Sequence, residues 1–147
     1  MRAFCCMSDK NIDNNAPKVS NEVLEWVRFA EMDYTTANHL DKTLYPKPME
    51  IICYHCQQCA EKYLKALTEY LGKEIEKTHD LGNLATTISE SIEVPQNVLV
   101  SCAKLTQYGV KIRYSQEFEM SDSHVRAALA DMENVRTWCK DKLNIKA

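Results

Sequence analysis

Apolar residues recur at helical spacing along most of the chain, and the clearest repeat lies in its middle. On a helix that turns about 100° per residue, one face of this stretch is almost entirely apolar. His55, Gln58, Lys62 and Lys65 form a polar stripe beside that face, and Glu61 is expected to point away from the core. We therefore predict a helix that begins near Pro48 and ends at Gly72. Its predicted core face consists of Ile52, Cys56, Cys59, Tyr63, Ala66, Leu67 and Tyr70.

Four further helices follow from the same spacing. Ser20 or Asn21 caps the first, which ends before two prolines break the pattern at Tyr45–Pro48. Shorter patterns predict a helix capped by Thr78 or Asp80 and another that begins at Pro95. We expect an all-α, up-and-down antiparallel bundle of four to five helices in residues 20–147, preceded by a flexible tail at residues 1–19. The long flanking helices are predicted from about Asn21 to Lys42 and from Ser121 to about Leu143.

The composition fits a folded domain and limits the possible partners. Hydrophobic residues make up 45% of the chain and charged residues 27%, the balance of an ordinary globular protein. The net charge of −3 excludes a protein that binds polyanions over its whole surface. Contact with nucleic acid would need a local patch. One candidate is the stretch from Val94 to Gln116, whose only charged residues are Lys104, Lys111 and Arg113.

The seven cysteines are expected to be reduced and to fill the core of a cytoplasmic protein. We identify no secretory signal and no apolar run of about 18 residues that would span a membrane. Cys53, Cys56 and Cys59 match the first three ligands of an iron–sulfur run, but Tyr63 and Leu64 stand where the fourth cysteine belongs. We predict no disulfide, no metal and no cofactor.

Two interpretations of the polar stripe and of His79 remain open from the residues alone. Long polar side chains at the edge of a buried face commonly extend to water, although His55 is an unusual residue for that position without a partner. His79 and Asp80 lie at a predicted helix N-terminus, where Asp80 can be a simple cap. The alternative is a phosphate-facing site in which His79 is supported by Lys62 or Lys65.

A short Arg-Tyr pair ends the basic stretch. Arg113 suits bidentate contact with phosphate, and Tyr114 suits stacking on a base. A salt bridge at the end of the bundle would explain the same pair equally well.

Together these motifs resemble the HEPN domain family, and in particular its prokaryotic stand-alone branch. The resemblance spans about Val23 to Leu143 and rests on QQ-x-x-EKYLKAL at 57–67, THDL at 78–81 and RY at 113–114. It implies an up-and-down helical bundle that is commonly a homodimer. It also implies association with a nucleotide or RNA, and partnership with a minimal nucleotidyltransferase in toxin–antitoxin or stress systems.

One departure from the family pattern concerns catalysis. Ribonuclease members of the family carry Arg-x4-6-His, but Phe118, Glu119 and Met120 follow Arg113 at those spacings, and the next histidine is His124. We therefore predict a noncatalytic nucleotide- or RNA-binding domain. The alternatives are a metal-independent ribonuclease that uses another histidine, such as His55 or His79, and a purely structural dimerisation module. The predicted binding residues are His55, Gln58, Lys62, Lys65, His79, Arg113 and Tyr114.

Overall fold

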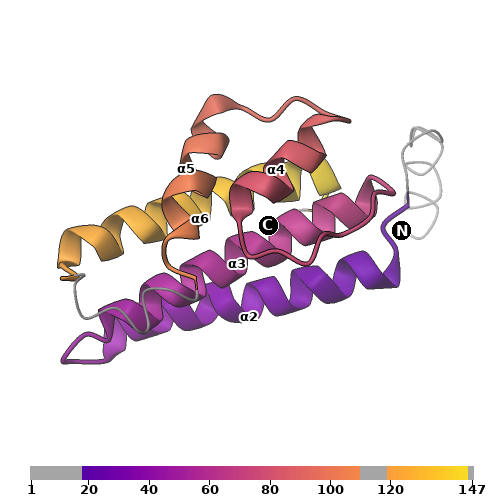
Figure 1. Cartoon of the computed structure of the whole chain (residues 1–147). Helices are drawn as coiled ribbons and strands as arrows, with labels where there is room; N and C mark the ends of the chain where they lie inside the picture. The colour runs from indigo at the N-terminus through magenta and orange to yellow at the C-terminus, as the bar shows by residue number, and fades with distance from the viewer. Residues whose placement is uncertain (1–17, 110–118, 146–147) are drawn as a thin grey trace, which may run out of the picture.

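The computed structural model describes residues 18–109 and 119–145. These residues form five helices and no strand (Figure 1), so the prediction of an all-α fold is confirmed. The predicted tail falls mainly on residues 1–17, which lie outside the described residues. The helices are α2 (Asn21–Thr43), α3 (Met49–Tyr70), α4 (Leu81–Ser89), α5 (Gln96–Thr106) and α6 (Asp122–Leu143).

Helix α3 is the centre of the bundle. It lies alongside α2, to which it is joined by a short turn, and it also contacts α4, α5 and α6 (Figure 1). Most of its middle is therefore buried, including Tyr63, Leu64 and Leu67. In the described part of the chain, no helix combines the length and the apolar character needed to cross a membrane.

The helix ends agree with the local signals in the sequence. The Ser20 hydroxyl accepts a hydrogen bond from the Val23 N–H at 3.2 Å. Of the two candidate caps for α4, Asp80 is the N-cap, because its carboxylate accepts a hydrogen bond from the backbone N–H of Gly82 at 2.8 Å. Gly72 follows α3 with φ of 73°, a left-handed conformation that glycine adopts without steric cost.

A partly buried ion pair fastens α6 to α2 and α3. The Arg136 guanidinium donates to both carboxylate oxygens of Glu31, at 2.8 and 2.9 Å. The Tyr63 hydroxyl donates to the same carboxylate at 2.7 Å, and the Arg136 guanidinium carbon lies 3.9 Å from the centre of the Tyr34 ring. Side chains from three helices thus meet at one carboxylate, which fixes how α2 and α3 lie beside α6.

Candidate functional site

The polar stripe is the part of the middle of α3 that meets solvent. Every other residue of α3 between positions 53 and 68 is buried by the surrounding helices. The stripe predicted from the helical spacing of the sequence is therefore the part of this span that the structure leaves open to solvent. The residues of this span that are not buried are Tyr54, His55, Gln58, Lys62 and Lys65.

One half of the stripe is organised by Asp33, an α2 residue that the sequence analysis missed. Asp33 is buried, with 8% of its surface exposed. Its Oδ1 lies 2.7 Å from Nδ1 of His55, and its Oδ2 pairs with the Lys62 ammonium. With Nδ1 donating to Asp33, the other ring nitrogen of His55 is left to face a further partner.

The other half of the stripe is organised by Glu61, and here the expectation was wrong. Glu61 does not point away into solvent but is buried, with 4% of its surface exposed. Its carboxylate lies 2.9 Å from Nδ1 of His79 and 3.3 Å from the Lys65 ammonium. The physical reason is that the segment leading into α4 covers this side of α3, which the periodicity of a single helix cannot show.

Two glutamines extend the Glu61 cluster into the bundle. Gln57 is fully buried, and its side-chain nitrogen donates to Glu61 at 3.2 Å and to the His79 carbonyl oxygen at 3.3 Å. Gln58 in turn donates to the Gln57 side-chain oxygen at 2.7 Å. The predicted residue Gln58 is therefore tied to His79 through its neighbour.

The structure thus brings five of the predicted site residues onto one surface, in two carboxylate-centred groups. Each carboxylate holds one lysine and one histidine, so each group is electrically neutral when its imidazole is neutral. The two other predicted residues, Arg113 and Tyr114, lie outside the described residues, and their place beside the stripe stays a prediction. The five residues are His55 and Lys62 with Asp33, and Gln58, Lys65 and His79 with Glu61.

A paired lysine is still able to bind an anion. An ammonium group has three N–H donors, and its carboxylate partner engages only part of that capacity. The carboxylates hold the lysines and the histidines in fixed positions, which lowers the entropic cost of ordering them around a ligand. The arrangement is suited to hydrogen bonding with a phosphate and, through the histidines, to proton transfer.

The cysteines of α3 are core residues. Cys53, Cys56 and Cys59 are fully buried and free of disulfide bonds. Within residues 18–109 and 119–145 no group of three or more metal-ligating side chains comes together. Burial raises the pKa of the Cys53 thiol to about 12 and does the same for Cys102. These groups are therefore uncharged thiols at neutral pH.

We expect the buried thiols to resist alkylation in the folded protein. The reactive form is the thiolate, and both the raised pKa and the lack of access suppress it. Iodoacetamide at about pH 7.5 should leave Cys53 and Cys102 unmodified in the native protein and should modify both in urea, as measured by peptide mass spectrometry. Fast native labelling of either residue would show that the bundle opens around α3.

The comparisons with known proteins agree with this architecture. The chain matches the HEPN domain model over residues 23–142, and it therefore belongs to the HEPN domain family. TT1696 from Thermus thermophilus has a similar crystal structure, with a TM-score of 0.73 and 21% identity, over 84% of this chain and 100% of that one. ST0689, an archaeal HEPN homologue, has a TM-score of 0.66 and 21% identity, over 82% and 97% of the two chains. No curated protein matches the chain significantly.

Proposed function

We propose that this HEPN-family chain is a noncatalytic nucleotide- or RNA-binding protein whose ligand places a phosphate on the polar stripe of α3. The observation that carries the proposal is the pairing of two buried carboxylates, Asp33 and Glu61, with two lysines and two histidines on one exposed strip.

The accessible atoms of the site support this role. The side chains of Lys62 and Lys65 are 24% and 12% exposed, whereas that of His79 is 64% exposed. A phosphate can therefore take hydrogen bonds from the ammonium groups, and also from the outer nitrogen of His79 when that imidazole is protonated, while the carboxylates remain behind them. In this proposal Arg113 adds a bidentate phosphate contact and Tyr114 a stacking surface.

The proposal includes a homodimer that acts in the cytoplasm, with a minimal nucleotidyltransferase as a protein partner in a toxin–antitoxin or stress system. Support for an interface comes from large apolar side chains that α2 leaves exposed, because unpaired apolar surface favours association. Sedimentation at micromolar concentration tests the dimer. Leu24 and Met32 of α2 are 48% and 53% exposed.

Removing the stripe lysines should weaken binding of nucleotides and short RNAs. We expect Lys62→Ala and Lys65→Ala each to lower the affinity by about 10-fold or more, the typical size of a hydrogen bond to a charged group, and to reduce the salt dependence of binding. Calorimetry and fluorescence anisotropy measure both effects. The matched control is Lys142→Ala, because this exposed lysine of α6 lies beside Asp141 and away from the stripe. Equal losses in all three variants would contradict the site.

A metal-independent ribonuclease is the second candidate. One observation favours it: His55 and His79 each direct Nδ1 to a carboxylate and keep the other nitrogen for proton transfer. In the same binding samples we expect labelled single-stranded RNA to stay intact in EDTA. Cleavage that disappears in His79→Gln or Arg113→Ala would replace the noncatalytic proposal with this one.

A further inference from the structure

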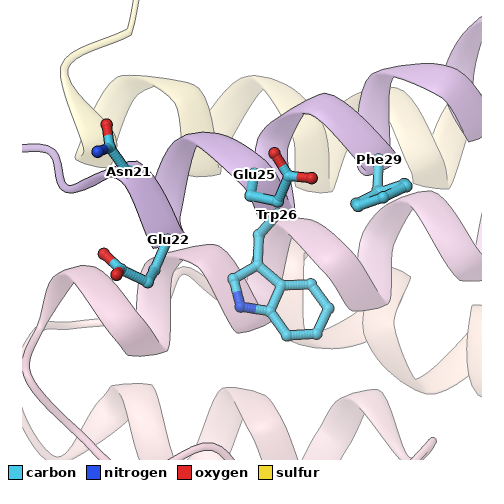
Figure 2. A pocket seen from close by; sticks show the side chains of 5 residues that line it. All are labelled: Asn21, Glu22, Glu25, Trp26 and Phe29. Carbon is cyan, nitrogen blue, oxygen red and sulfur yellow. The ribbon is translucent and has the colours of Figure 1, made fainter.

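A pocket of about 490 Å³ opens on the flank of α2 beside the polar stripe (Figure 2). The Trp26 ring extends from α2 beside the neighbouring helix, and the Phe29 ring lies about one turn further along. Trp26 is half-buried against the hydrophobic core, so its ring is held in place before any ligand arrives. The lining residues are Asn21, Glu22, Glu25, Trp26 and Phe29.

The pocket adjoins the proposed phosphate site, because Lys65 lies close to the ring of Trp26. The Lys65 ammonium lies 5.6 Å from the centre of the Trp26 ring and 3.3 Å from the Glu61 carboxylate. Lys65 is therefore the residue of the stripe that lies next to the aromatic pocket. A ligand that has a flat apolar part and a phosphate can contact Trp26 and Lys65 together.

The charges around the pocket decide which part of such a ligand enters it. Glu22 and Glu25 both line the pocket, and their carboxylates repel phosphate but accept hydrogen bonds from amines. Glu25 already pairs with Arg28 at 2.7 Å, so Glu22 is the principal acceptor. The guanidinium of Arg28 lies over the Phe29 ring, 4.6 Å from its centre, whereas the Lys65 ammonium lies beside the Trp26 ring. A flat group on the tryptophan therefore places its phosphate toward Lys65.

We propose that the Trp26–Phe29 pocket holds a nucleobase with an exocyclic amine (adenine, guanine or cytosine) while the phosphate of the same nucleotide lies at Lys65. The base stacks on the Trp26 ring, and its amine donates to Glu22. Uracil lacks this amine, and its N3–H donor is flanked by two carbonyl oxygens that the same carboxylate repels. The inference rests on the proposed function and adds to it the part of the ligand that the stripe does not contact.

Titration of the full chain with ATP, UTP and inorganic tripolyphosphate tests the base pocket. We expect ATP to bind more tightly than UTP or tripolyphosphate by calorimetry and to quench tryptophan fluorescence. Trp26→Leu should weaken ATP binding by about 5- to 150-fold, the range of one base–aromatic stack, and should leave tripolyphosphate binding unchanged. Phe29→Ala should also weaken ATP binding. Because Phe29 is exposed, this substitution should leave the fold intact. Circular dichroism verifies that each variant is folded.

A substitution of Glu22 tests the contribution of its carboxylate separately. Glu22→Gln replaces an acceptor-only group with one that also donates, so the ratio of the affinities for ATP and UTP should fall, while the contribution of stacking on Trp26 remains. Equal binding of ATP and tripolyphosphate would overturn the base pocket and leave the phosphate site standing. Equal binding of ATP and UTP in the wild type would overturn the choice of base. Failure of all three probes to bind would overturn the pocket and the proposed function together.

Discussion

Replacing Glu61 by alanine should lower the free energy of unfolding by about 2–4 kcal/mol, somewhat less than the loss of one partner of a fully buried ion pair. The change leaves Lys65, whose side chain is only 12% exposed, without its carboxylate. It also removes an acceptor from the fully buried Gln57 amide. The partial exposure of Lys65 keeps the expected loss below that of a wholly buried pair, because the ammonium can turn toward water.

Urea denaturation at neutral pH and fixed protein concentration measures the Glu61 effect. Glu61→Gln is the matched variant, because it keeps the volume and an acceptor for Gln57 while it removes the negative charge, and it should cost about 1–2 kcal/mol. In both variants the His79 ring loses the carboxylate that orients it, so NMR signals of this ring should shift. A Glu61→Ala protein as stable as the wild type would mean that the cluster contributes no net stability.

The helices and their ends were predictable from the sequence because their signals are local. The Ser20 cap, the Asp80 cap and the glycine at Gly72 each act within a few residues of a helix end, and the structure confirms all three. Apolar spacing identified the face of α3 that packs against the rest of the bundle. None of these signals depends on which helix lies next to which.

The carboxylates of the site were not predicted because their environment is set by packing between distant segments. Glu61 is acidic and falls outside the apolar face, so the periodicity of α3 alone predicts that it is exposed to solvent. In the structure the chain around His79 covers it. Asp33 offered one usable signal. It lies between Ala30 and Ala37 at helical spacing, and an acid among buried alanines requires a partner. That partner lies 22 residues further along, at His55.

Replacing Arg136 by methionine should destabilise the protein strongly at neutral pH and progressively less as the pH falls. Arg136 donates to both oxygens of Glu31, and this bidentate contact is the largest cause of the lowered pKa of the Glu31 carboxyl. A lowered pKa in the folded state gives stability that is complete above the unfolded value, near 4.5, and is lost as the pH falls through the folded pKa.

At neutral pH the Arg136→Met protein should therefore be less stable than the wild type by about 2–3 kcal/mol, less than for a fully buried pair because Glu31 is partly exposed. At about pH 3, below the unfolded value of 4.5, the difference should shrink, because Glu31 is then protonated in the unfolded chain and its contact with Arg136 favours the folded state less. Arg28→Met removes an exposed pair with Glu25 and should change stability little at either pH. Urea midpoints for the three proteins at both pH values provide the measurement. A difference between Arg136→Met and wild type that stays undiminished at low pH would show that Arg136 acts by packing on Tyr34 and not through the charge on Glu31.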